Sequence, residues 1–160
     1  MTEEKIQQLF TTAINRLIGN KREILSNLAA ICDELYDERT LEAERDRLNA
    51  ELIVLTEVFD QMVAENAHVA QDQEEYQKRH AEVTRQYDAT KAEYNAVCER
   101  IANTLSQRSM LLKFIDTLRQ QKDVVTEFDA TLWGTLLDHM TVYSKEDMRF
   151  TFRDGTVIRV

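Results

Sequence analysis

The 160-residue sequence contains no proline and only three glycines, so the two residue types that most often interrupt helices are nearly absent. Its two cysteines, Cys32 and Cys98, lie far apart without CxxC spacing, which predicts free thiols in a reducing compartment. No apolar run approaches the roughly 18 residues that span a bilayer, and the first 20 residues lack a signal-peptide pattern. We therefore expect a cytoplasmic chain with no membrane partner.

The charge balance also limits the possible partners. The formal net charge is −9, and residues 1–40, 41–122 and 123–160 are each net acidic. Proteins that bind DNA usually carry a basic face, because phosphate contacts dominate affinity. Tight DNA binding is therefore not expected as the main role of this stretch, although a local basic face remains an open alternative.

Residues 1–40 form the first predicted segment, which is helical. Apolar side chains recur at helical spacing over residues 3–18, and a second helical pattern continues to Leu35. Gly19 and Asn20 predict the end of the first helix, and Asn20 with Glu23 has capping-box spacing for the next.

Residues 41–122 show the heptad repeat of a coiled coil. Apolar positions alternate at spacings of four and three, first over residues 41–69 and again from Tyr76 to Ile101. This pattern predicts an arm of about 30 helical residues, or ~45 Å, in each half. The first half of the seam consists of Leu41, Arg45, Leu48, Leu52, Leu55, Phe59, Met62, Asn66 and Val69.

The arm has two possible conformations. Polar seam positions at Asn66, Gln73 and His80 favour a turn near residues 70–73, and Asp72 followed by Glu75 has the spacing that caps a second helix. The four–three rhythm is nevertheless unbroken, which leaves one continuous helix as the alternative. We expect a mainly α fold built on a long antiparallel coiled-coil hairpin.

Residues 123–160 change character and predict a short helix followed by a β-hairpin. Thr126 with Asp129 has capping spacing, and Phe150 and Phe152 alternate with polar residues as in a strand. The Asp154-Gly155 dipeptide is a strong hairpin-turn signal.

The sequence offers no constellation that would support catalysis or bind a cofactor. His68, His80 and His139 lack metal-ligand spacing to one another or to a cysteine, and no glycine-rich loop could hold a phosphate. We therefore expect no catalytic residue, metal, cofactor or small-molecule substrate in this chain.

Two kinds of interaction remain. The first is contact with another copy of the chain, either through the predicted turn region or through an exposed strand edge. The second is direct DNA contact by local cations. The candidates for self-interaction are Asn66, His68, Val69, Gln73 and Tyr76, and those for DNA contact are Lys21, Arg22, Arg149 and Arg153.

Several short segments together resemble one family. They are Ala13-Ile14-Asn15 followed by Gly19-Asn20-Lys21, Ala70-Gln71-Asp72-Gln73 followed by Tyr76, Thr126-Glu127-Phe128-Asp129 followed by Leu132-Trp133, and Val142-Tyr143 followed by Phe150-x-Phe-x-Asp-Gly-Thr. Their order and spacing resemble the region after the zinc ribbon in large serine recombinases of bacterial mobile elements. The resemblance spans nearly the whole chain, although each motif alone is weakly specific.

The resemblance implies a site-specific recombinase that integrates or excises DNA. It implies an antiparallel coiled-coil arm whose end engages other subunits and so controls synapsis, with DNA bound through the full-length, nucleoid-associated parent. The catalytic domain with its nucleophilic serine and the cysteine pairs of the zinc ribbon have no counterpart here, so the chain is expected to be a C-terminal fragment that is not itself an enzyme. A generic coiled-coil scaffold is the remaining alternative.

Overall fold

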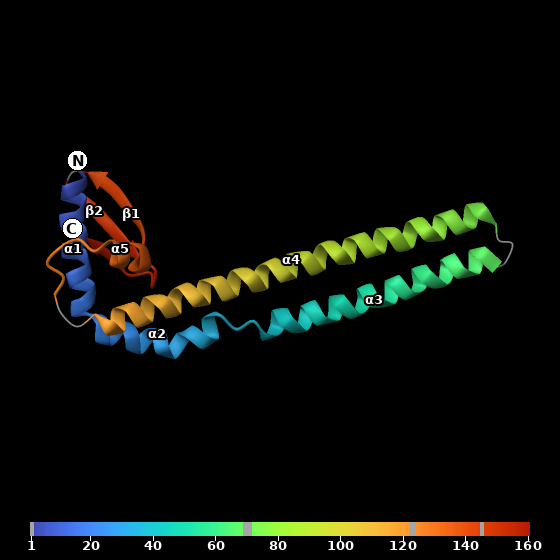
Figure 1. The fold of residues 1–160 in the computed structure, drawn as a ribbon, viewed down its shortest axis with the longest axis horizontal. Helices are drawn as coiled ribbons and strands as arrows, with labels where there is room; N and C mark the ends of the chain where they lie inside the picture. The colour runs from blue at the N-terminus through green and yellow to red at the C-terminus, as the bar shows by residue number, and fades with distance from the viewer. Residues whose placement is uncertain (1, 69–71, 122–123, 145) are drawn as a thin grey trace. The chain divides into compact units, whose positions relative to one another are not determined.

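The computed structural model describes residues 2–68, 72–121, 124–144 and 146–160, and within them the chain is mainly helical with a small three-stranded antiparallel sheet. Two compact units are present: residues 1–36 with 106–160, called the mixed unit, and residues 37–105, called the arm unit. The elements, labelled in Figure 1, are α1 (Glu3–Gly19), α2 (Lys21–Leu35), α3 (Arg39–His68), α4 (Gln73–Gln120), α5 (Ala130–Leu136), β1 (Leu137–Ser144), β2 (Asp147–Phe152) and β3 (Val157–Arg159).

These units divide the chain differently from the boundaries expected at residues 40 and 122. The last part of α4, residues 106–120, belongs to the mixed unit because its apolar side chains are buried in that unit's core. Phe114 and Leu118 are both fully buried there with residues of α1. The N-terminal helices and the C-terminal strands, expected as separate segments, therefore share one core.

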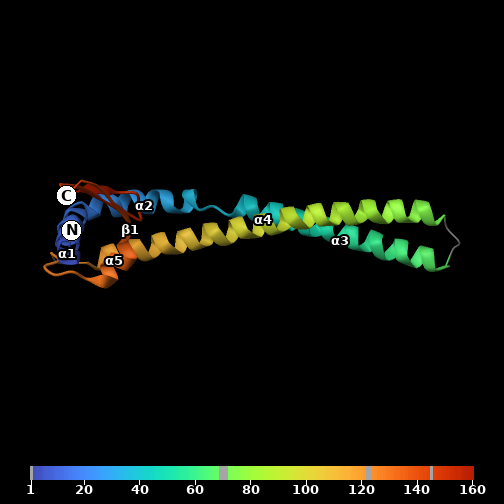
Figure 2. The ribbon, with the colours of Figure 1, turned by 90° about the horizontal axis from the view of Figure 1, so that it is seen from above.

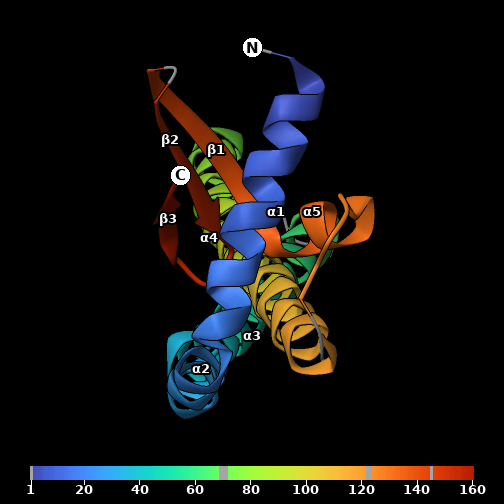
Figure 3. The same ribbon diagram turned by 90° about the vertical axis from the view of Figure 1, so that its left-hand side faces the viewer.

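The mixed unit is built around α1, which lies next to the sheet and α5 in Figure 3. Phe10 is fully buried, and its ring lies 4.9 Å from the ring of Trp133 in α5 and 6.0 Å from that of Phe150 in β2, measured between centroids. Edge-on and tilted aromatic contacts of this kind add to the stabilisation that burial gives. The apolar face predicted for residues 3–18 is thus the side of α1 that packs on α5 and the sheet.

Strand β2 lies at the centre of the sheet, in the order β1-β2-β3. Phe150 and Phe152 are buried in alternation, as the sequence pattern predicts, and Met148 is buried on the same face, while Arg149 and Thr151 lie on the opposite face. Gly155 has φ of 86°, the left-handed conformation that a glycine adopts without strain. The predicted Asp154-Gly155 turn and the β-hairpin around it are confirmed.

Two capping predictions differ from the structure. Helix α1 ends at Gly19 as expected, but the Asn20 side chain makes no capping hydrogen bond to α2. At α5 the cap is Asp129 itself rather than Thr126, because the Asp129 carboxylate accepts hydrogen bonds from the backbone N–H groups of Thr131 and Leu132 at 2.7 and 3.1 Å.

The arm unit contains α3 and the first part of α4, which lie next to each other in Figure 1 and cross in the view of Figure 2. Leu48, Leu52 and Met62 of the predicted seam are buried. Just before α3, the Asp37 carboxylate accepts a hydrogen bond from the backbone N–H of Arg39, the first residue of the helix, at 3.0 Å. Helix α3 ends at His68 and α4 begins at Gln73, whereas residues 69–71 of the predicted turn lie outside the described residues.

Candidate interaction surfaces

Two of the residues predicted to mediate self-interaction are brought together in the arm unit. The Gln73 side-chain amide donates a hydrogen bond to Asn66 Oδ1 at 3.2 Å, so the last turn of α3 and the first turn of α4 are joined by a polar layer. Asp72 caps α4 by accepting from the backbone N–H of Glu74 at 2.9 Å. Val69 and the side chain of His68 lie outside the described residues.

Next to this polar layer is an aromatic cluster. The His80 ring lies 4.6 Å from the Phe59 ring and 6.0 Å from the ring of Tyr76, measured between centroids. Tyr76, the third described self-interaction candidate, is half-buried in this cluster. The prediction of a seam-lining role for His80 therefore agrees with its contact across α3 and α4.

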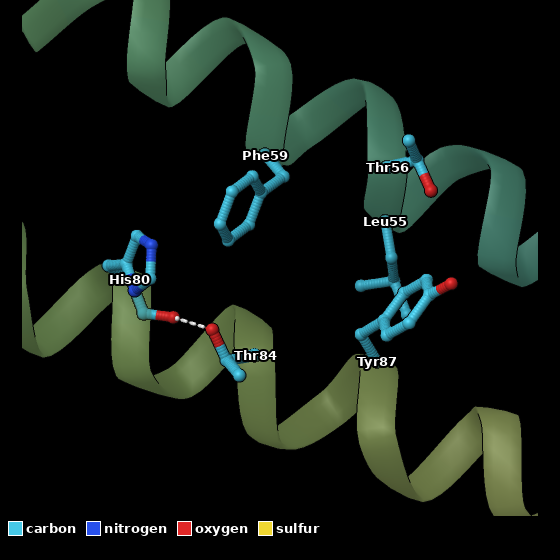
Figure 4. A pocket seen from close by; sticks show the side chains of 6 residues that line it. All are labelled: Leu55, Thr56, Phe59, His80, Thr84 and Tyr87. Atoms are coloured by element: carbon cyan, nitrogen blue, oxygen red, sulfur yellow. Dashed lines mark hydrogen bonds between the residues drawn. The ribbon is translucent and has the colours of Figure 1, made fainter.

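A cavity of about 390 Å³ adjoins the cluster, and Figure 4 shows six side chains around it. Its lining is mainly apolar, and its polar groups are few: the Thr84 hydroxyl donates to the backbone carbonyl of His80 at 2.9 Å and is thereby occupied. Such a lining suits an apolar side chain or ligand and contains no carboxylate. The residues are Leu55, Thr56, Phe59, His80, Thr84 and Tyr87.

Further along the arm unit the seam is better packed. Leu48, Val97 and Ile101 form a buried cluster, and the Thr90 hydroxyl donates to Glu51 Oε1 at 3.3 Å. A hydrogen bond with Cys98 raises the pKa of the Tyr94 hydroxyl above its ordinary value of 10.0. This end of the arm unit thus has a buried apolar cluster, in contrast to the cavity near its other end.

Three of the four predicted DNA-contacting cations make contacts within the mixed unit. Lys21 Nζ donates to the backbone carbonyl of Gln121 at 2.6 Å, and Arg153 donates to that of Gly134 at 3.3 Å. Arg149 pairs with Asp147 at 3.4 Å and lies over the ring of Tyr143 at 4.4 Å, and the hydrogen bond to Asp147 raises its pKa.

The fourth cation, Arg22, is exposed on α2. In the structure, Lys21, Arg149 and Arg153 each bind a backbone carbonyl or a carboxylate of the mixed unit itself.

The outer strands of the sheet are β1 and β3. Tyr143 and Val142 on β1 are 63% and 48% exposed, and Val157 on β3 is 55% exposed. These exposed side chains lie on the two edge strands, which the sequence analysis suggested as a second contact surface.

Sequence reasoning missed two features of the arm unit. One is the cavity, which arises where Phe59, His80 and Tyr87 leave the seam incompletely filled. The other is a group of exposed apolar side chains on α3, among them Val54 and Val58. Their signal was present in the unusually apolar stretch of residues 52–63, but the heptad count considered only one face of the helix.

In the part of the chain that the structure describes, no group of three or more His, Cys, Asp or Glu side chains is arranged to hold a metal ion. Among the same residues, no helix is both long and apolar enough to cross a membrane.

Comparison of the chain with protein-family models, with curated proteins and with solved structures finds no match.

Proposed function

We propose that this chain is the C-terminal fragment of a site-specific DNA recombinase and acts as a coiled-coil module for subunit interaction and synapsis control. The proposal is supported by the ordered motifs that resemble large serine recombinases. Two of these motifs have clear structural roles: Asn15 and Asp129 each make backbone hydrogen bonds that organise the mixed unit. Activity on DNA would belong to the parent protein, through its catalytic domain.

The observation that carries the proposal is the direction of the contacts between α3 and α4. Residue numbers rise along α3 as they fall along α4, through Glu51 with Thr90, then Phe59 with His80, then Asn66 with Gln73. We infer that the arm is an antiparallel coiled-coil hairpin. A hairpin buries its own seam within one chain, which leaves its turn and its outer faces available to another subunit.

The self-interaction residues fit this role by their position. Asn66, Gln73 and Tyr76 lie where α3 ends and α4 begins, next to the cavity, and His68 and Val69 lie between them in sequence. An apolar side chain of another copy could fill space that the seam leaves open. The polar Asn66–Gln73 layer would restrict the register at the cost of some stability.

Two alternatives are less well supported. As a DNA-contacting segment, the chain would need free cations, whereas Lys21, Arg149 and Arg153 have internal partners. A steep salt dependence of DNA binding would support that reading. A generic scaffold would account for the arm but would leave the folded mixed unit without a role.

Small-angle scattering with mass determination on a dilute sample tests the hairpin. A continuous helix over residues 39–120 would be about 120 Å long, from about 82 residues at 1.5 Å each. We expect a monomer with a shorter maximum dimension. A two-chain particle of ~120 Å or more at every concentration would contradict the hairpin.

Sedimentation of two variants then tests the end of the arm. We expect Val69→Asp and Tyr76→Asp to weaken self-association and to leave the helix content unchanged by circular dichroism, because a buried unpaired carboxylate is costly at an interface. Unchanged association in both variants would refute a role for the turn region.

A further inference from the structure

Helix α3 exposes more apolar surface than a two-helix arm requires. Beyond the buried seam, Ile53, Val54, Val58 and Val63 are 53%, 56%, 39% and 47% exposed. Single exposed apolar residues are ordinary, but four within 11 positions of one helix form a candidate contact surface.

These side chains lie on two flanks of α3, one on each side of the seam. Val54 and Val58 belong to one flank, which we call the Val54 strip, and Ile53 and Val63 belong to the other, the Ile53 strip. The Val54 strip has its own four–three spacing, which is the repeat that a second helix recognises. It consists of Arg47, Glu51, Val54, Val58, Gln61 and Glu65.

The Val54 strip is complementary to itself when two copies run antiparallel. With Val54 opposite the partner's Val58, Glu51 faces the partner's Gln61, and Arg47 faces the partner's Glu65. The two-fold axis generates each pair twice, so the surface closes on itself without an unmatched end. Every layer also combines the two alternating positions of the repeat, as an antiparallel coiled coil requires.

The polar side chains at each end of the strip pair with each other along α3. Arg47 pairs with Glu51 at 3.3 Å, and the Gln61 amide donates to Glu65 at 3.0 Å. The Arg47 and Glu51 side chains are 62% and 48% exposed, although Glu51 also accepts a hydrogen bond from Thr90. In the antiparallel arrangement, the Arg47–Glu51 pair of one copy would therefore face the Gln61–Glu65 pair of the other.

The Ile53 strip lacks this property. With Ile53 opposite the partner's Val63, which again combines the two alternating positions, Thr56 faces the partner's Asp60 and Asn49 faces the partner's Ala67. No layer of this arrangement pairs opposite charges, so charge does not favour association there. The two flanks thus have similar apolar exposure, but only the Val54 strip adds a layer of opposite charges, Arg47 with the partner's Glu65, to its apolar centre.

We propose that the Val54 strip is the surface on which a second copy of this chain docks, with the two α3 helices antiparallel about an axis between Val54 and Val58. This inference rests on the proposed hairpin, since α4 must leave the strip open. It names a contact separate from the turn region: about 10 residues of helix, or ~15 Å, lie between the axis and Asn66.

Sedimentation equilibrium of the full chain over a concentration series tests the strip. We expect Val54→Glu, which places a carboxylate in the central layer, to raise the concentration for half-association by at least about tenfold. Ile53→Glu is the matched control, with the same charge change at a neighbouring position of similar exposure, and should leave association unchanged.

A charge-swap pair gives the sharper test. Arg47→Glu and Glu65→Arg should each weaken association alone, because each creates like-charged pairs at both ends of the interface. An equimolar mixture of the two variants should associate again, since both end pairs become opposite in charge. Weakening by each single variant is specific to the antiparallel register, because in a parallel pair positions 47 and 65 would each face their own copy and neither variant would create a new like-charged pair. Rescue in the mixture shows in addition that the weakening is not a general loss of folding.

The outcomes separate this inference from the proposed function. Equal weakening by Val54→Glu and Ile53→Glu, failure of the mixed variants to associate, or a chain that is monomeric at all concentrations would overturn the strip. If Tyr76→Asp abolishes association while Val54→Glu does not, the strip is refuted and the turn-region contact stands. Scattering that shows a continuous helix would refute the hairpin itself.

Discussion

Asn15 makes the contact whose loss should be most informative about the mixed unit. Its side-chain amide donates to the backbone carbonyl of Val125 at 2.8 Å, and its Oδ1 accepts from the Val125 N–H at 2.8 Å. One side chain on α1 thus satisfies both backbone groups of a residue in the segment that precedes α5. Asn15→Ala removes both bonds and leaves two half-buried polar groups without these partners.

The size of the effect follows from these two bonds. A typical hydrogen bond contributes about 1 kcal/mol net, and an unsatisfied buried group costs about 1–3 kcal/mol. Because Val125 is half-buried, water would compensate in part, and we expect a loss of about 2 kcal/mol for the mixed unit. The matched control is Thr12→Ala, which removes only a hydrogen bond to Gln8 of the same helix on an exposed face.

The assay must report on one unit, since a chain with two compact units need not unfold in a single step. Trp133 is the only tryptophan and lies in the mixed unit, so its fluorescence during urea unfolding reports that unit alone. Hydrogen exchange at the Val125 amide adds a local measurement. An Asn15→Ala change below about 0.5 kcal/mol, with the protection of that amide unchanged, would refute the reasoning.

Two further predictions concern the start of α3 and the final hairpin. Hydrogen bonds from Arg39 lower the pKa of Asp37 from 3.8 to about 2, so any stability this pair contributes is present above pH 3.8 and is lost as the pH falls through 2. An NMR titration should find the Asp37 midpoint near pH 2 and a higher one in Arg39→Gln, and a wild-type midpoint near 3.8 would contradict the pairing. Gly155→Ala places a Cβ at φ of 86° and should destabilise the mixed unit by about 1 kcal/mol by Trp133 fluorescence, with an unchanged midpoint as the contrary result.

The local features of the chain followed from local signals. The end of α1 at Gly19, the buried alternation of Phe150 and Phe152, and the Asp154-Gly155 turn depend on backbone preferences and on side-chain periodicity, which neighbouring residues determine. The α5 cap was placed on the wrong member of the Thr126–Asp129 pair, because both residue types occur at N-caps and only the position where the helix begins selects one of them.

The candidate surfaces could not be predicted from periodicity alone. A heptad repeat states that a seam exists but not which helix fills it, so the contacts of Phe59 with His80 and of Asn66 with Gln73 could not be derived from spacing alone. The exposure of Val54 and Val58 likewise depends on which face of α3 the neighbouring helix covers.

The sequence by itself determined the helical character, the coiled-coil repeat and the closing β-hairpin, since the absence of proline, the heptad spacing and the Asp-Gly dipeptide act over a few residues. Only the tertiary structure decided that residues 1–36 and 106–160 share a core, and that Asn15 binds Val125 across 110 positions of sequence. The physical reason is that burial and long-range hydrogen bonds depend on which surfaces meet in space, and a one-dimensional pattern of apolar residues is compatible with many such pairings.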